Sequence, residues 1–150
     1  MRNEFELKGP IQSVEVSYFV HATEDAGTIS KAVSAFLPDN VRPVEERVEG
    51  HFGNPIVWVR YHLTDDDAGT VIDRLAESLS SPTKDRLEGN INELIDEHSA
   101  LYLRFDKQFL VMGRLEVGTG DPVRIRVKPR KFLLRAGAKE FYREVLLGGR

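Results

Sequence analysis

The chain has 150 residues, no cysteine and a formal net charge of −3 at pH 7, and we expect residues 1–150 to form one domain with its own hydrophobic core. The absence of cysteine excludes disulfides, thiolate nucleophiles and cysteine-ligated zinc sites. No apolar segment reaches the ~20 residues of a membrane helix, and residues 1–9 have the composition of a short charged tail without a signal-peptide core, so we expect a cytoplasmic protein.

The first half of the chain alternates between strand and helix patterns. Apolar and polar residues alternate over 11–20, which predicts a strand. Thr23 is the expected N-cap of a helix that ends before Pro38. Two further strands are predicted over 41–49 and 55–63, and the glycine-rich segment between them favours a hairpin connection.

The second half is predicted to begin with two helices and to end with a third. Apolar residues at helical spacing follow Thr64, and Pro82 stands at the first helical position of the next segment. The remaining elements are expected as strands over 100–106, 109–117 and 122–128 and a helix over 138–147. Hairpin connections dominate this order, so we predict an α+β fold with an antiparallel or mixed sheet and helices mainly on one face.

The other face of that sheet is expected to carry aromatic side chains. If Val59 and Tyr61 point into the core, period-2 alternation places Trp58 outward. Phe19 has the outward parity of the first strand. An exposed aromatic patch of this kind predicts either a dimer interface or a surface on which bases stack.

Positive charge is concentrated near the C-terminus. Nine of the 21 Lys and Arg residues, but only two of the 24 acidic residues, lie in 122–150. Alternation over 122–128 places every second, basic residue on one strand face, where it can contact phosphates. The alternative is a solvated edge strand protected from edge pairing by Lys and Pro. The candidate RNA contacts in this region are Arg124, Arg126, Lys128, Arg130 and Lys131.

A second candidate surface lies in the segment 101–108. Its apolar residues are expected to face the core, which leaves Tyr102 and Arg104 outside, and Lys107 follows the strand. Aromatic and cationic residues interleaved on a sheet can stack bases and hold phosphates. An ordinary amphipathic strand whose Arg104 pairs with a neighbouring acid explains the same pattern.

Histidine and carboxylate residues give no pattern typical of a metal or catalytic site. The four histidines, at positions 21, 51, 62 and 98, lack helical metal-ligand spacing. His21 and Glu24 fit an acid–base pair, but helix capping explains the surrounding segment without any chemistry. Three consecutive aspartates from Asp65 fit the first turn of a helix. We therefore expect no metal, no cofactor and no enzymatic activity.

Four motifs in this order resemble an archaeal family of small proteins described as RNA-binding or predicted exosome-associated. The motifs are His21-Ala22-Thr23-Glu24-Asp25, Gly50-His51-Phe52-Gly53-Asn54-Pro55, Leu101-Tyr102-Leu103-Arg104-Phe105-Asp106-Lys107-Gln108 and Asp121-Pro122-Val123-Arg124-Ile125-Arg126-Val127-Lys128. The resemblance implies a fold similar to ribosomal protein L5, often dimeric. It also implies a non-catalytic cytoplasmic role in RNA metabolism near the exosome and RNase P.

Three functions are thus open on the sequence. The leading hypothesis is an RNA-binding protein that contacts phosphates through its basic C-terminal strand. The alternative is a protein–protein interaction module, or a homodimer, that docks through Phe19 and Trp58. The third is an enzyme with a carboxylate–histidine site, which requires His21 or His51 within hydrogen-bond reach of an acid in a pocket.

Overall fold

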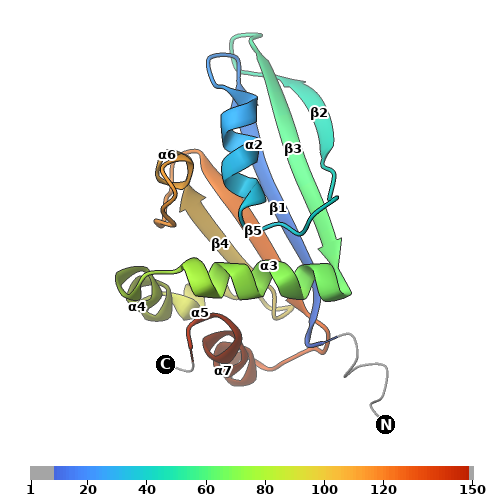
Figure 1. Cartoon of the computed structure of the whole chain (residues 1–150). Coiled ribbons are helices and arrows are strands. Elements are labelled where there is room, and N and C mark those ends of the chain that lie inside the picture. The colour runs from blue at the N-terminus through green and yellow to red at the C-terminus, as the bar shows by residue number, and fades with distance from the viewer. Residues whose placement is uncertain (1–8, 149–150) are drawn as a thin grey trace.

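The computed structural model describes residues 9–148 and contains a five-stranded antiparallel sheet of order β2-β3-β1-β5-β4 (Figure 1). The expected N-terminal tail lies outside the described residues, apart from Gly9. The first strand of the chain therefore lies in the centre of the sheet, between the hairpin β2–β3 and the pair β5–β4. The strands are β1 (Ile11–His21), β2 (Val44–Glu49), β3 (Pro55–Thr64), β4 (Leu101–Asp106) and β5 (Pro122–Pro129).

The helices lie on one side of this sheet. In Figure 1, α2 lies along the strands and α3 runs across them, and α4, α5 and α7 gather near one end of the sheet. The predicted α+β class, with antiparallel strands and helices on one face, is confirmed. The helices are α2 (Ala26–Ser34), α3 (Asp65–Ser78), α4 (Ser81–Gly89), α5 (Ile91–Leu94), α6 (Lys107–Val111) and α7 (Arg135–Leu146).

The helix starts follow capping chemistry, with one correction. The N-cap of α2 is Asp25 rather than Thr23, and its carboxylate accepts hydrogen bonds from the N–H groups of Gly27 at 2.9 Å and Thr28 at 3.3 Å. Ser80 caps α4 in the same way by accepting from Thr83. The helix predicted to begin at Pro82 is divided at Asn90 into α4 and the single turn α5.

The predicted strand over 109–117 is wrong. The carboxylate of Asp106 accepts a hydrogen bond from the Phe109 N–H at 2.9 Å and thereby starts the short helix α6 directly after β4. Gly113, at φ 83°, then turns the chain back. What remains of strand pairing here is an isolated bridge between Phe105 and Val117. The N-cap outweighed the apolar pattern that suggested a strand.

Burial against the helices fixes which face of the sheet is open. Val59, Tyr61 and Leu63 of β3 are 4%, 4% and 2% exposed, as their predicted inward parity requires. Leu101, Leu103 and Phe105 of β4 are likewise buried. Because side chains alternate along a strand, the intervening residues must lie on the opposite, open face. A register slip of one residue would exchange the two sets, so this burial also specifies the open face.

Candidate nucleic-acid interface

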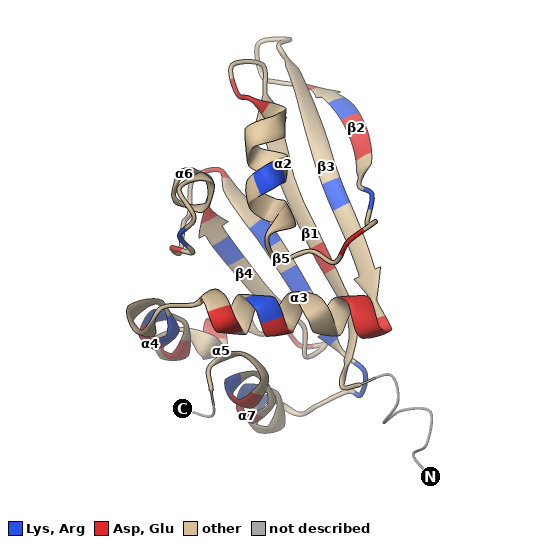
Figure 2. Cartoon of the chain, in the orientation of Figure 1, with Lys and Arg blue, Asp and Glu red and all other residues tan. Residues whose placement is uncertain are grey.

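Three arginines lie in one transverse row on the open face. Reading across β3, β1, β5 and β4, the register aligns Arg60, Ser17, Arg124 and Arg104. We call these four residues the cation row. Figure 2 shows the basic positions of β4 and β5 side by side. Adjacent strands are about 4.8 Å apart, so the row presents its charges within about 15 Å.

Two of the three arginines in the cation row have no acidic partner among residues 9–148. Arg104 and Arg124 are direct cross-strand partners, and within residues 9–148 neither has a carboxylate at ion-pair distance. Like charges placed opposite each other destabilise a sheet by a few tenths of a kcal/mol up to about 1 kcal/mol. Arg60 lies 3.7 Å from Glu46, a long contact at the sheet edge. An arrangement that costs the free protein stability is suited to an anionic ligand.

Aromatic rings adjoin the cation row on one side. Phe19 and Trp58 are cross-strand partners whose ring centroids are 5.9 Å apart with an interplanar angle of 21°. The Arg60 guanidinium lies 4.2 Å from the Trp58 ring centroid, and that of Arg124 lies 5.9 Å from the Phe19 centroid. Both rings are half-buried, partly by each other. They offer a stacking surface with cations alongside.

Tyr102 adjoins the cation row on the other side. It is the cross-strand partner of Arg126, whose guanidinium lies 5.7 Å from the tyrosine ring centroid. The Tyr102 hydroxyl donates to Asp96 at 3.1 Å, which fixes the ring. Burial and this hydrogen bond raise the pKa of Tyr102. Tyr102 is 39% exposed, so much of its surface remains accessible.

The other carboxylate oxygen of Asp96 accepts backbone hydrogen bonds, which hold Asp96 in place beside Tyr102. Burial alone would raise the pKa of Asp96, but hydrogen bonds from the N–H groups of Ala100 at 3.0 Å and His98 at 2.8 Å, with the Tyr102 hydroxyl, lower it below its ordinary value. The carboxylate is therefore held in its charged form. An ionised Asp96 makes Tyr102 a rigid part of the open face rather than a freely rotating side chain.

A shallow pocket of about 210 Å³ is formed where these groups meet. Its lining includes Ser17, Trp58 and Tyr102, together with Arg104, Arg124 and Arg126. Glu15, opposite Arg126 in the register, also lines it. The acids that the register places on this face are Glu15 and Glu46, and Asp106 at its edge is engaged in capping α6. Cations outnumber acids here even though the whole chain is acidic.

The remaining predicted contacts divide into exposed and structural residues. Lys128 lies on the open face as the partner of Ser13, and Lys131 is exposed beyond the end of β5. Arg130 donates to the carbonyls of Gly9 at 2.8 Å and Ile11 at 3.2 Å and pairs with Asp65 at 2.6 Å. Its guanidinium therefore fastens the start of β1 to α3, and we leave Arg130 out of the interface.

Lys107 is buried, with an exposed fraction of 4%. Its ammonium donates to the Phe19 carbonyl and to Asp121, both at 2.6 Å, and lies 3.2 Å from Glu24. The sequence prediction placed Lys107 among the RNA contacts, but these bonds use its three donors inside the protein. We therefore remove it from the proposed interface as well.

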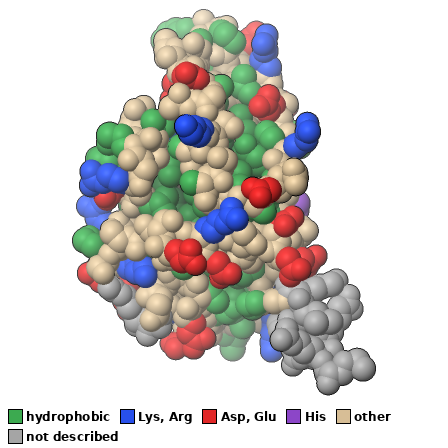
Figure 3. Space-filling model, viewed as in Figure 1, with side chains coloured by type: hydrophobic (Ala, Val, Ile, Leu, Met, Phe, Trp, Pro, Cys, Tyr) green, Lys and Arg blue, Asp and Glu red, His purple; other side chains and the backbone are tan. Residues whose placement is uncertain are grey.

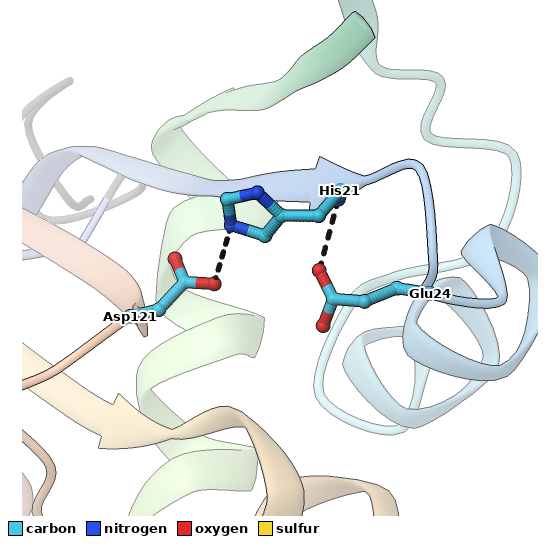
Figure 4. A group of neighbouring side chains, drawn as sticks. All are labelled: His21, Glu24 and Asp121. Atoms are coloured by element: carbon cyan, nitrogen blue, oxygen red, sulfur yellow. Dashed lines mark hydrogen bonds and ion pairs between the residues drawn. The ribbon is translucent and has the colours of Figure 1, made fainter. Parts of the chain in front are cut away.

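His21 completes this cluster (Figure 4). Its Nε2 lies 2.9 Å from Asp121, and its backbone N–H donates to Glu24 at 2.9 Å. His21, Glu24 and Asp121 could by their spacing ligate a metal ion. Both carboxylates contact the Lys107 ammonium, and the cluster forms an ion-pair network that ties β1 to α6 and to the start of β5.

The helix-covered side of the molecule differs from the open face. Figure 3 shows acidic and basic side chains scattered over it, interspersed with hydrophobic surface beside α2. In the described part of the chain, no helix has the length and apolarity needed to cross a membrane.

Arg60 is the residue of this surface that sequence reasoning did not select. Its outward parity beside Trp58 was recognisable, but it stands in the acidic first half of the chain, distant from the basic C-terminal segment. The fold brings it into the cation row because β1 lies between β3 and β5.

Together, the fold and the open face define an α+β protein that presents a cationic and aromatic sheet surface. Residues 13–129 match a protein family described as RNA binding, and the chain belongs to this RNA-binding family. It is 30% identical over 141 residues to RNA-binding protein PAB1135 of Pyrococcus abyssi, an alignment that covers 88% of this chain and 92% of the relative.

Solved structures share the fold. Protein AF2318 from Archaeglobus fulgidus is 28% identical with a TM-score of 0.77, covering 90% of this chain and 99% of that one. Mth689, a DUF54 protein from Methanothermobacter thermautotrophicus, is 29% identical with a TM-score of 0.75, covering 92% and 99%.

Proposed function

We propose that this chain is a non-catalytic RNA-binding protein and that RNA lies across the open face of its sheet. The cation row is the observation that carries the proposal, because Arg104 and Arg124 stand opposite each other without acidic partners in residues 9–148. Phosphates between them would relieve their repulsion. The family match and the RNA-binding name of the P. abyssi relative support the same ligand.

The spacing of the face suits a single strand. Same-face positions on one strand are about 6.8 Å apart, close to twice the ~3.4 Å axial charge spacing of one nucleic-acid strand. The Phe19–Trp58 pair and Tyr102 stand one position either side of the cation row. Phosphates would bind between the arginines of the row, whose strands are about 4.8 Å apart, and along β5 at the ~6.8 Å spacing of its same-face residues. Bases would stack on the rings beside the row, which needs bases that are not paired in a duplex.

The proposal extends to cellular context. We place the protein in the cytoplasm, in archaeal RNA metabolism, with exosome or RNase P components as partners, because its ordered motifs resemble a family described in those terms. Similarity to ribosomal protein L5 is part of the same prediction. Co-purification of RNase P or exosome subunits from archaeal extract, abolished by substitution of the cation row, would support this context.

The absence of catalysis is also proposed. His21 and Asp121 meet the distance condition for an acid–base pair. Both carboxylates of this cluster, however, are ion-paired with the buried Lys107 ammonium, which supports a structural role for them. Incubation of labelled RNA with the protein should leave its length unchanged, and cleavage that is lost in His21→Ala would contradict this view.

Salt dependence tests the RNA proposal directly. Arg60 is left out of the count because Glu46 lies 3.7 Å from it. Four contacts, from Arg104, Arg124, Arg126 and Lys128, each contribute about −0.7 to the slope of log affinity against log salt, so the slope should be roughly −3. A fluorescent single-stranded oligonucleotide titrated between 50 and 300 mM salt measures it. No binding at the lowest salt, or a flat profile, would overturn the proposal.

A second candidate is an interaction module or homodimer that uses the same face. The indole N–H of Trp58 is buried without a hydrogen-bond partner in residues 9–148, which favours a partner carbonyl over that site. Light scattering of the wild type and of Trp58→Asp separates the candidates. A dimer that Trp58→Asp dissociates, with cation-row substitutions tolerated, favours the interaction module.

A further inference from the structure

A second, larger pocket adjoins the open face at the β4 edge. It has a volume of about 530 Å³ and lies between β4, the α4–α5 region and the segment 117–119. We propose that this edge pocket binds one unpaired base of an RNA strand that continues from the cation row. The inference rests on the proposed function and names its ligand more closely, as single-stranded RNA with one nucleotide turned over the sheet edge.

Continuity between the two surfaces is the first argument. Tyr102, Leu103 and Arg104 line both the edge pocket and the pocket on the open face. Arg104 is the last cation of the row, so a phosphate bound there leaves the next nucleotide at the pocket entrance. The Tyr102 ring is held at this boundary by its hydrogen bond to Asp96.

The lining has the composition of a base-binding site. Leu87, Leu94 and Val117 supply apolar walls, and Asn90 supplies an amide. One Asn90 N–H donates to the Arg86 carbonyl at 3.1 Å, which orients the amide and leaves its carbonyl oxygen for the edge of a base. The volume lies within the range of small-molecule sites, which are mostly apolar with a few placed polar groups.

Charge at the pocket rim fits a nucleotide rather than an apolar ligand. Arg86 stands on the α4 side and Arg104 on the β4 side. Glu93 is the acid of the lining and can accept a hydrogen bond from an exocyclic amine of a base. A phosphate at the entrance would meet two guanidinium groups, while the base enters between the leucines.

The far wall of the pocket is already in place without a ligand. The Gly118 N–H donates to the Arg104 carbonyl at 3.1 Å, which holds the segment 117–119 against β4. A side chain at 118 would not fit, because its Cβ would lie 2.8 Å from the Cα of Asp106. A preformed site reduces the ordering cost of binding.

The test blocks the pocket with a bulky side chain and follows the bound base by its fluorescence. The probe is a ten-nucleotide oligoadenylate with 2-aminopurine at one position at a time, titrated at low salt. With the wild type, one position should gain fluorescence severalfold as its base leaves the stack. Asn90→Phe should abolish that gain and weaken binding about tenfold, the loss of one base contact. Asn92→Phe, an exposed neighbour outside the pocket lining, should retain both.

The outcomes distinguish the two levels of the proposal. If Asn90→Phe binds and fluoresces as the wild type does while Arg124→Gln weakens binding, the edge pocket is excluded and RNA binding on the open face stands. Equal affinity for a duplex of the same sequence also overturns the pocket. If the wild type binds no RNA at low salt, the proposed function itself falls. Thr119→Phe fills the pocket from the opposite wall and replaces Asn90→Phe if the latter fails to fold.

Discussion

Replacing Arg104 with glutamine should make the protein more stable and bind RNA less well. In the free protein, Arg104 faces Arg124 across the strand pair, and no carboxylate in residues 9–148 lies at ion-pair distance from it. Two like charges about 5 Å apart in water repel by about 0.8 kcal/mol. Cross-strand measurements bracket such pairs at about 0.2–1 kcal/mol, so we expect a gain of about 0.5 kcal/mol.

The same substitution removes one phosphate contact. Each contact with a single strand contributes about −0.7 to the salt slope, so the slope should fall from roughly −3 to about −2. At 0.1 M salt this corresponds to an affinity about fivefold lower. Fluorescence titration at several salt concentrations measures the slope. Thermal unfolding measures the stability gain, which should appear as a rise of about 1–2 °C in Tm and shrink as salt screens the repulsion.

Arg47→Gln is the matched control. Arg47 lies in the same sheet but opposite Val57, hence on the other face, and it is exposed. Its substitution should leave the salt slope unchanged. The reasoning is refuted if Arg104→Gln lowers the Tm while the salt slope stays as in the wild type, because Arg104 would then be a structural residue rather than a ligand contact.

Three further substitutions test the structural assignments. Lys107→Met should destabilise the protein by about 3 kcal/mol in urea unfolding, since it leaves the partly buried Glu24 carboxylate uncompensated; an equally large loss in the exposed Lys131→Met would contradict this origin. Arg130→Leu should lower the stability but leave the RNA salt slope intact, and a reduced slope would return Arg130 to the interface. In the wild type the lowered pKa of Asp96 stabilises the fold above the unfolded-state pKa, and this contribution is lost as the pH falls through the lower folded-state pKa. The wild type should therefore be more stable than Asp96→Asn by an amount that shrinks as the pH falls. A difference that grows on acidification would refute the lowered pKa of Asp96.

Face assignments were predictable from the sequence because alternation is a local property. The outward parity of Tyr102, Arg104 and Trp58 follows from their buried neighbours alone, and the structure confirms it. Strand order is not local. No pattern within 11–20 or 55–63 indicates that β1 separates β3 from β5, and this order alone aligns Arg60 with Arg124.

Lys107 shows why other parts of the site could not be predicted from the sequence. Its sequence context suggests a basic residue continuing the surface of β4. The cap formed by Asp106 turns the chain into α6, and the lysine then meets Glu24 and Asp121, which are 83 and 14 residues away in sequence. A buried ion-pair network of this kind depends on three segments meeting, so neither spacing nor composition predicts it.

The distribution of charge along the chain is therefore a poor guide to charge on the surface. Two basic residues of the C-terminal segment form ion pairs with acids from earlier in the chain: Arg130 pairs with Asp65 and Arg143 with Glu88. The acidic first 121 residues in turn supply Arg60 and Arg104 to the open face. An acidic protein can thus carry a cationic sheet, because the field at the RNA site depends on the balance of arginines and acids on that one face rather than on the net charge of the chain. Neutralising Arg104 and Arg124 together should reduce the salt slope from roughly −3 to about −1.4, because Arg126 and Lys128 remain, whereas removing positive charge from α7 on the helix side should leave the slope unaltered.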